Sequence, residues 1–355
     1  MSRFLSARHA AVKPYTPGEQ PQDRKYIKLN TNESPYPPAP GVIEALNARE
    51  AGRLMLYPDP EAKALHRALA EYYGLEENQV LAGNGSDEIL AFAFQAFCDR
   101  EHGAAFPDIS YGFYPVFAQI YGIPARVIPL DDRYRVRPAD YFHCGAMVVI
   151  ANPNAPTGLC LNPEDIRELC RQNPENVVLI DEAYVDFGGQ SAVKLLAEYE
   201  NLLVVQTCSK ARNLAGARLG FALGDPALIQ DLRKMKYSFN PYNINRLSLL
   251  AGVAAIRDEE YFQDCRKKIM DTRRWVTEAL RLRGFDVLDS RANFIFAAPP
   301  GGISGGDYYR RLKEKGILVR HFETPRTKEF VRISIGTQEQ MEALVRAGDE
   351  MLKEG

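Results

Sequence analysis

Three short runs of aliphatic residues constrain the fold of this chain more than any other feature of its sequence. They occupy residues 147–150, 177–180 and 202–205. Continuous apolar runs of this length are typical of strands that are buried on both faces of a parallel sheet. Residues 86–98 and 164–172 have the pattern of helices, so strands and helices alternate along this part of the chain. The sequence therefore predicts an α/β fold with a mostly parallel sheet.

The pattern changes after residue 245, where a long helix is expected. Its apolar residues recur at helical spacing: Phe262, Cys265, Ile269, Val276 and Leu280. Short strands are expected around residues 294, 319 and 333, and a closing helix over residues 338–352. We therefore predict an N-terminal arm that begins a small domain (residues 1–41), a large domain (42–250) and a small C-terminal α+β domain (251–355).

The first 41 residues are expected to be an arm because they are interrupted by prolines, among them those at positions 14, 17, 35, 37, 38 and 40. Proline lacks a backbone donor and breaks helix interiors, so residues 1–18 leave little room for an amphipathic helix, and a helix is expected only near Val42. We expect an ordered arm that crosses to the small domain or to a partner subunit.

The charge balance excludes several classes of partner. The chain has 44 Lys and Arg residues against 46 Asp and Glu residues, which gives a formal net charge of -2. Because there is no excess of positive charge, neither nucleic acid nor a membrane is expected as a partner. The expected partner is a small molecule. No apolar run approaches the ~20 residues of a membrane-spanning helix, and export is not expected.

The cysteine pattern indicates a reducing compartment. The six cysteines include no C-x-x-C pair, and the chain has only five histidines. Neither a zinc site nor a disulfide framework is expected from these residues. We therefore predict no metal and a cytoplasmic location.

Polar residues follow the three apolar runs, at the point where each predicted strand ends. They occupy residues 152–158, 181–184 and 207–210. Open α/β sheets bind their ligands at the carboxyl ends of the strands, so one pocket can collect all three segments. An Asp in a poorly solvated place requires a cationic partner, and a Lys near another cation has a lowered pKa that makes it nucleophilic. Asp181, Tyr184 and Lys210 together suggest a cofactor that reacts with amines.

These motifs resemble those of a known family. The segment Asn152-Pro153 to Pro156-Thr157-Gly158, the segment 181–184, and Ser209-Lys210 followed by residues 218–220 resemble the class I and II aminotransferases. Within that group, residues 28–36, 56–59, 181–187 and 214–220 are most similar to histidinol-phosphate aminotransferases, and the resemblance covers essentially the whole chain. It implies the type I fold of aspartate aminotransferase, pyridoxal phosphate as cofactor, and a homodimer.

The resemblance implies roles for five residues around the cofactor ring. Lys210 would bind the cofactor aldehyde covalently and then move a proton between substrate and cofactor. Asp181 would pair with the ring nitrogen and keep it protonated. Tyr184 and Asn154 would bind the phenolic oxygen, although many relatives carry Asn-Asn where this chain has Asn-Ala. Tyr111 would stack on the ring.

The cofactor phosphate would be bound at a helix N-terminus that follows a Gly-Asn-Gly turn, where free N–H groups and the helix dipole favour an anion. The residues assigned to it are Gly85, Ser86, Asp87, Ser209 and Arg218. Asp87 is expected to contribute its backbone N–H rather than its carboxylate. Tyr57 resembles the residue that reaches the phosphate from the neighbouring subunit, which implies a shared active site.

Two arginines are candidates for the substrate. Arg332 matches the family arginine that binds the α-carboxylate of the amino donor, and Arg320 and Tyr15 match positions that hold a substrate phosphate. The predicted reaction is the transfer of an amino group from L-histidinol phosphate to 2-oxoglutarate. A threonine-phosphate decarboxylase and an aromatic amino acid aminotransferase remain as alternatives on the same scaffold. No nucleic-acid-binding domain precedes the motif at residue 28, so a regulator built on this fold is not expected.

Overall fold

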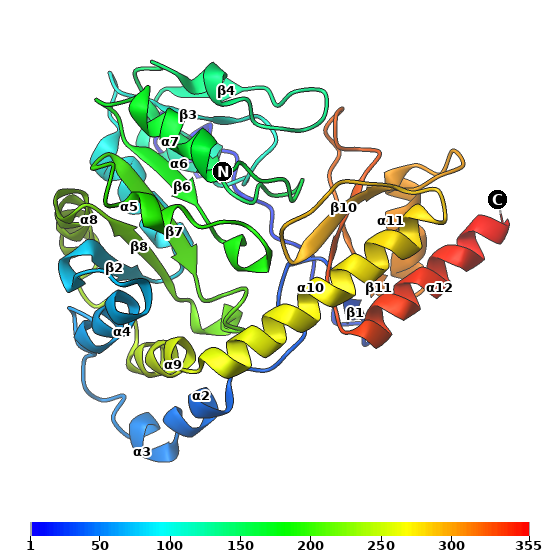
Figure 1. Ribbon diagram of the computed structural model, residues 1–355, viewed down its shortest axis with the longest axis horizontal. Coiled ribbons are helices and arrows are strands. Elements are labelled where there is room, and N and C mark those ends of the chain that lie inside the picture. Colours follow the sequence, from blue (N-terminus) through cyan, green and yellow to red (C-terminus); the bar gives the residue numbers. More distant parts are fainter. Residues whose placement is uncertain (1, 355) are drawn as a thin grey trace.

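The largest unit of the protein is a sheet of seven strands with helices on both faces (Figure 1). The computed structural model describes residues 2–354, and within them the strand order is β2-β8-β7-β6-β5-β3-β4. Only β8 is antiparallel to its neighbours β2 and β7. The strands are β2 (Val80–Gly83), β3 (Ala104–Pro107), β4 (Ala125–Ile128), β5 (Met147–Ala151), β6 (Val178–Asp181), β7 (Leu202–Thr207) and β8 (Gly220–Gly224). The predicted α/β class and the three predicted strands are confirmed.

Successive residues of the central strands point to opposite faces of this sheet and enter two separate cores. In β5, Val148 and Ile150 pack with α4, α7 and α9, whereas Met147 and Val149 pack with α5, α6 and α8. Burial on both faces explains why the strand has no polar residue. The helices are α4 (Lys63–Tyr73), α5 (Ser86–Phe97), α6 (Tyr114–Tyr121), α7 (Pro163–Arg171), α8 (Pro226–Phe239) and α9 (Arg246–Arg257).

A smaller unit with its own core lies beside the large sheet. Its four strands have the order β12-β13-β10-β9 within the described residues, and all neighbouring pairs are antiparallel. The strands are β9 (Asp286–Val287), β10 (Phe294–Ala298), β12 (Arg320–His321) and β13 (Val331–Ser334). They pack with α10 (Glu259–Arg281), α11 (Gly305–Glu314) and α12 (Gln338–Glu354). The strands and closing helix expected here are confirmed.

The long helix expected after residue 245 is two helices. Asp258 ends α9 and caps α10, because its side chain accepts a hydrogen bond from the backbone N–H of Tyr261. The buried residues Ala251, Ala255 and Ile256 of α9 belong to the core of the large sheet. The predicted boundary at residue 250 therefore falls inside α9, and the division into 1–41, 42–250 and 251–355 stays a prediction.

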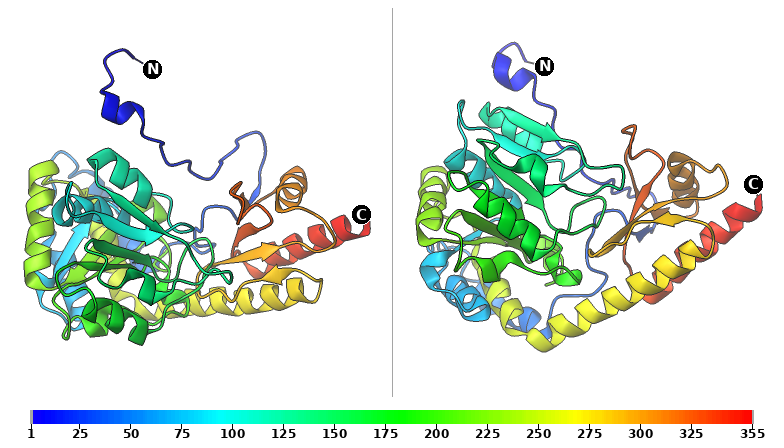
Figure 2. Two further views of the ribbon diagram at one scale, coloured as in Figure 1. Left: turned by 90° about the horizontal axis from the view of Figure 1, so that it is seen from above. Right: turned by 45° about the horizontal axis from the view of Figure 1, so that its top comes forward.

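The N-terminal arm runs past both units (Figure 2). Its first helix, α1 (Ala7–Ala10), lies near α6, and β1 (Ile27–Lys28) pairs in parallel with β11 (Ile317–Leu318) of the smaller unit. The arm thus crosses to the small unit, which was one of the two expected alternatives.

The remaining helices are short. They are α2 (Pro40–Ala45) and α3 (Ala48–Ala51), with 3-10 turns η1 (Glu77–Gln79), η2 (Pro138–Tyr141), η3 (Val185–Phe187), η4 (Ala192–Leu195) and η5 (Ala215–Ala217). The helix expected near Val42 is therefore α2. Within residues 2–354, no helix combines the length and the apolar character needed to cross a membrane.

The N-terminus of α5 lies directly against β8, and a glycine makes this close approach possible. A Cβ atom at position 220 would lie 2.2 Å from the backbone nitrogen of Ser86 and 2.4 Å from the backbone carbon of Gly85. A Cβ at Gly216, in contrast, would have nothing within 4 Å. Gly220 thus determines where the first turn of α5 lies relative to the ends of β7 and β8.

We expect Gly220→Ala to lower the free energy of unfolding by about 1–3 kcal/mol, because the added methyl group forces two backbone segments apart. Gly216→Ala, the matched control, is expected to change it by less than about 0.5 kcal/mol. Urea denaturation followed by circular dichroism measures both values. Equal stabilities of the two variants would show that the contact between β8 and α5 is not constrained as described.

Candidate active site

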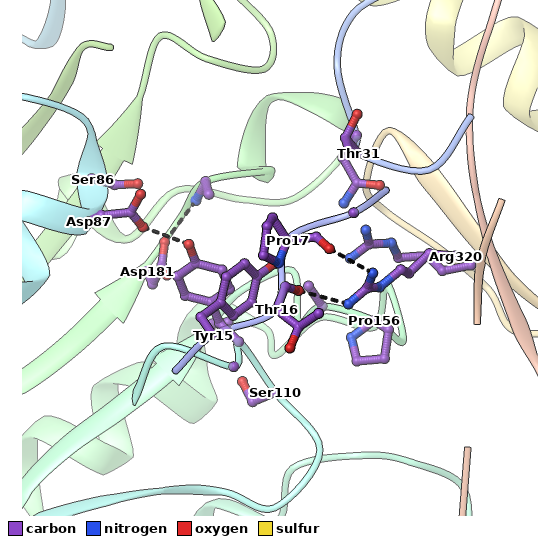
Figure 3. Close-up of a pocket in the computed structure, with 18 of the residues that line it drawn as sticks. Tyr15, Thr16, Pro17, Thr31, Ser86, Asp87, Ser110, Pro156, Asp181 and Arg320 are labelled. Atoms are coloured by element: carbon purple, nitrogen blue, oxygen red, sulfur yellow. Dashed lines mark hydrogen bonds between the residues drawn. The ribbon is translucent and has the colours of Figure 1, made fainter. Parts of the chain in front are cut away.

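A cavity of about 670 Å³ lies at the carboxyl ends of β5, β6 and β7. Its walls come from the loops after these strands, from arm residues 13–18 and from the strands of the smaller unit (Figure 3). Eleven of the residues singled out in the sequence line it: Tyr15, Ser86, Asp87, Tyr111, Asp181, Tyr184, Ser209, Lys210, Arg218, Arg320 and Arg332. Segments more than 300 residues apart in the sequence therefore meet in one pocket.

Lys210 lies just after β7, with its side chain directed into the cavity. Its Nζ is 3.4 Å from the backbone oxygen of Thr31 and 5.7 Å from the centre of the Tyr184 ring. Burial, and then the charge of Arg332, lower the pKa of this amine to about 8. An amine with this pKa is neutral, and therefore nucleophilic, in a larger fraction of molecules than an ordinary lysine.

Asp181 is the last residue of β6 and is buried. Its Oδ2 accepts a hydrogen bond of 2.8 Å from the hydroxyl of Tyr114, and its Oδ1 accepts one of 3.2 Å from the backbone N–H of Ala183. Burial raises the pKa of the carboxyl to about 6. Within residues 2–354 no basic side chain forms an ion pair with it. A carboxylate in such a place is suited to a cationic ligand in the cavity.

Tyr184 is connected to the arm through Asn32, a residue that the sequence reasoning did not assign. The Nδ2 of Asn32 donates to the Tyr184 hydroxyl at 3.0 Å, and its Oδ1 accepts from the hydroxyl of Ser334 at 3.0 Å. Asn32 is buried and has a φ of 55°. Asparagine tolerates this left-handed conformation better than most residues. The presence of Asn within the motif at residues 28–36 was therefore the signal in the sequence that could have identified this residue.

The first turn of α5 and the residue Arg218 form a cradle suited to an anion. A Cβ at Gly85 would lie 2.6 Å from Nη2 of Arg218, so only glycine lets the guanidinium approach the helix N-terminus. Nη2 also donates to Oδ2 of Asp87 at 3.0 Å, and the Tyr111 hydroxyl donates to Oδ1 at 2.6 Å. The Asp87 carboxylate thus pairs with Arg218, whereas only its backbone was expected to take part.

Ser209 lines the same cavity as this cradle. It is buried, and its hydroxyl lies 2.9 Å from that of Thr207, which donates to the oxygen of Leu219 at 3.0 Å. The first turn of α5, the hydroxyls of Ser86 and Ser209 and the guanidinium of Arg218 therefore border the same cavity. This set of donors fits a phosphate group.

Asn154 does not take the position that was predicted for it. Its buried side chain is fully hydrogen-bonded: Oδ1 accepts from the Ser110 hydroxyl at 2.7 Å, and Nδ2 donates to the oxygen of Ile109 at 2.9 Å and to the Thr157 hydroxyl at 3.1 Å. It borders a second cavity, while Ala155 lines the main one. The predicted contact of Asn154 with the cofactor oxygen therefore does not fit, because its donors are already used within the loop.

Tyr57 also lies away from the cavity of its own chain. Its side chain is 78% exposed and stacks on Tyr242 with ring centres 4.6 Å apart. The three residues before it, Leu54, Met55 and Leu56, are exposed apolar residues as well. This apolar surface leaves Tyr57 free to contact another molecule.

Arg320 and Arg332 are paired residues on the neighbouring strands β12 and β13. Nη2 of Arg332 donates to the oxygen of Asn30 at 3.0 Å, and its guanidinium lies over the rings of Phe294 and Phe322. Arg320 donates to two arm carbonyls, to Thr16 at 2.8 Å and to Pro17 at 3.1 Å (Figure 3). The two guanidinium groups form a second end of the cavity that is suited to an anion.

The aromatic residues of the cavity form its walls. Tyr15 stacks on Phe113 with ring centres 4.5 Å apart, and its ring centre is 6.1 Å from that of Tyr111. Tyr111 is itself held at 5.7 Å against the edge of Tyr114. A flat ring between the two anion-binding ends would therefore meet aromatic surfaces. No group of three or more potential metal ligands is found among the described residues.

The fold and this cavity are those of an aminotransferase. The chain belongs to the family described as Aminotransferase class I and II, whose profile matches residues 24–347. The motif resemblance seen in the sequence is thereby confirmed.

Its relatives are more specific. The chain is 50% identical over 350 residues to the histidinol-phosphate aminotransferase of Marinomonas sp. (strain MWYL1), which covers 98% of this chain and 99% of the relative. It is 48% identical over 341 residues to that of Clostridium acetobutylicum, over 96% and 97% of the two chains. Among solved structures, the histidinol-phosphate aminotransferase of Sinorhizobium meliloti in complex with pyridoxal-5'-phosphate has a TM-score of 0.87 at 23% identity, over 100% of this chain and 99% of that chain. This last likeness shows the type I fold.

We expect Lys210 of the cofactor-free protein to react with formaldehyde and borohydride with a half-maximal rate near pH 8, because burial and Arg332 lower its pKa. In Arg332→Met the midpoint should move to higher pH, since a nearby positive charge that lowers the pKa of Lys210 is removed. Peptide mass spectrometry over pH 6–10 measures the methylation of this lysine. A midpoint in the range of exposed lysines would contradict the described environment.

Proposed function

We propose that this protein transfers an amino group from L-histidinol phosphate to 2-oxoglutarate, with pyridoxal phosphate as its cofactor, and so forms imidazole acetol phosphate and L-glutamate in histidine biosynthesis. The observation that carries this proposal is the paired position of Arg320 and Arg332 beyond Lys210. The two relatives that are about half identical over nearly the whole chain act on the same substrate according to their names.

The residues of the cavity fit pyridoxal phosphate. When bound, this cofactor supplies an aldehyde that condenses with amines and a protonated ring that accepts electrons. The donors at the first turn of α5, with Ser209 and Arg218, would hold its phosphate. Asp181 would keep its ring nitrogen protonated, and Tyr184 would donate to its phenolic oxygen.

Lys210 is the proposed nucleophile and proton carrier. Its lowered pKa allows the amine to react at neutral pH and later to accept a proton from the substrate carbon. The charge of Arg332, which lowers this pKa, is also the charge that the substrate would neutralise. Substrate binding would thus make Lys210 more basic at the stage at which it must take up a proton.

The two arginines would serve two different substrates in turn. A phosphate dianion would be held by both guanidinium groups, whereas the α-carboxylate of glutamate would require the planar pair of donors of one. Arg320 donates two of its five N–H groups to the carbonyls of Thr16 and Pro17, so three of its N–H groups remain for a substrate phosphate.

Two other reactions fit the same groups. A threonine-phosphate decarboxylase also requires a phosphate site and a carboxylate site. An aromatic amino acid aminotransferase would use the aromatic walls at Tyr15, Tyr111 and Phe322. Both alternatives use the same cofactor and are separated by their substrates.

The half-reaction separates these possibilities. We expect L-histidinol phosphate, added to the pyridoxal-phosphate-loaded protein without a keto acid, to remove the visible absorption band, and 2-oxoglutarate to restore it. The Lys210→Ala variant is the control and should show no turnover. Loss of the band with phenylalanine but not with histidinol phosphate would reject the proposed substrate. Release of carbon dioxide from threonine phosphate would favour the decarboxylase.

We also propose that the protein is a cytoplasmic homodimer in which Tyr57 reaches the phosphate end of the partner's cavity. The exposed apolar residues 54–57, with Tyr242 stacked on Tyr57, support an interface, since single-chain surfaces rarely leave such side chains together in water. The six free cysteines are compatible with a reducing compartment.

Mixed dimers test the shared site. Tyr57→Ala and Lys210→Ala should each be nearly inactive alone. Mixing their subunits should restore roughly a quarter of the wild-type activity, because half of the dimers are then mixed and each of these has one intact cavity. Refolding the two variants together, with each alone as control, measures this recovery. No gain on mixing would show that Tyr57 serves its own chain or no cavity.

A further inference from the structure

We propose that Tyr114 is a positioning residue for the cofactor's ring nitrogen: its hydroxyl holds the Asp181 carboxylate in its charged form and in the orientation that faces the cavity. This inference rests on the proposed function, since it assigns a positioning residue to Asp181, which would pair with the ring nitrogen of pyridoxal phosphate. Tyr114 itself does not line the cavity and acts only through Asp181.

Neighbouring aromatic rings hold the side chain of Tyr114 in the orientation in which its hydroxyl faces Asp181. The residue begins α6 and is completely buried. Its ring is held at 5.7 Å by the perpendicular ring of Tyr111 and at 5.9 Å by the tilted ring of Phe106. The hydroxyl therefore points at Oδ2 of Asp181, 2.8 Å away, and an exchange of partner would require repacking of the core.

The surroundings of Asp181 contain few groups that favour its charge. Tyr114 from α6 and the backbone N–H of Ala183 donate to it, while Asp87 at the start of α5 repels it. Tyr184 faces it as well and is neutral in this site. Burial raises the pKa of Asp181, and the Tyr114 hydrogen bond opposes this rise. The carboxylate has about four acceptor positions and receives two hydrogen bonds, so it can still accept a hydrogen bond from a ligand.

Two other buried tyrosines differ from Tyr114 in that their hydroxyl groups form no hydrogen bond in the described part of the chain. Tyr141 and Tyr308 are as deeply buried, and their hydroxyl groups have no hydrogen-bond partner within residues 2–354. Tyr141 lies in a core of the large sheet, as Tyr114 does. Replacing Tyr141 by Phe therefore removes the same atom from a comparable environment, without a contact to the cavity.

The first experiment needs no cofactor. Asp181 in the folded protein holds a proton up to about pH 6, whereas the unfolded chain loses it at a lower pH, so folding stability falls as pH rises through this interval. In Tyr114→Phe, we expect folding stability to keep falling over about one further pH unit, because the charged carboxylate of Asp181 has lost a hydrogen-bond donor. Thermal unfolding between pH 4 and pH 8 measures it, and Tyr141→Phe should follow the wild-type profile.

The second experiment measures the affinity for pyridoxal phosphate by fluorescence titration. The Tyr114→Phe variant should bind nearly normally above pH 8, about twofold more weakly at pH 7 and about eightfold more weakly near pH 5.5, as expected if the pKa of Asp181 rises by about one unit. In an Asp181→Asn background, the same substitution should have no pH-dependent effect, because no carboxylate is left to titrate.

The possible outcomes are distinct. If Tyr114→Phe and Tyr141→Phe have the same stability profile and the same affinity at every pH, the inference is wrong, and the proposed reaction is untouched. If the affinity loss is the same at all pH values and persists in the Asp181→Asn background, Tyr114 serves packing alone. If the wild-type protein forms no visible band with pyridoxal phosphate, the proposed function fails, while the cofactor-free stability profile still tests the pairing of Tyr114 with Asp181.

Discussion

The burial of ionisable groups at the carboxyl edge of the large sheet is the constraint on which the rest of this structure depends. Asp181 and Lys210 lie where water is scarce, and their pKa values move toward each other, to about 6 and about 8. Such groups are costly unless a ligand or a hydrogen bond compensates them. The apolar strands β5, β6 and β7 make this burial possible, because cores on both faces of the sheet leave only the strand ends for polar residues. The chemistry of the site is thus a consequence of how the sheet is covered.

The cavity also depends on contact between three segments that are distant in the sequence. The arm, the large sheet and the strands of the smaller unit each contribute one wall of the cavity. Asn32 connects them, since its side chain bonds both Tyr184 and Ser334. Arg320 bonds carbonyls of the same arm. The groups that would hold the substrate therefore contact the chain segment that lines the same cavity.

Local patterns were sufficient for some features. Apolar runs specify buried strands, and the Gly-Asn-Gly turn before α5 specifies a helix N-terminus, because both signals act over a few residues. The break between α9 and α10 was missed, since apolar spacing continues across Asp258 and only its capping bond reveals the end of a helix. Asn154 was placed in the cavity by resemblance, yet its bonds to Ile109 and Ser110 depend on a loop some 44 residues away. The pairing of Asp87 with Arg218 was missed for the same reason.

The sequence by itself determined the class of fold, the residues able to carry the chemistry and the family to which the chain belongs, because these follow from periodicity and from motifs in fixed order. Tertiary structure alone decided how those residues are paired: Tyr114 with Asp181, Asn32 with Tyr184, and Arg320 beside Arg332. It also decided which of them face the cavity. The physical reason is that hydrogen bonds and desolvation act between neighbours in space, and neighbours such as Asn32 and Ser334 are separated by 302 positions along the chain.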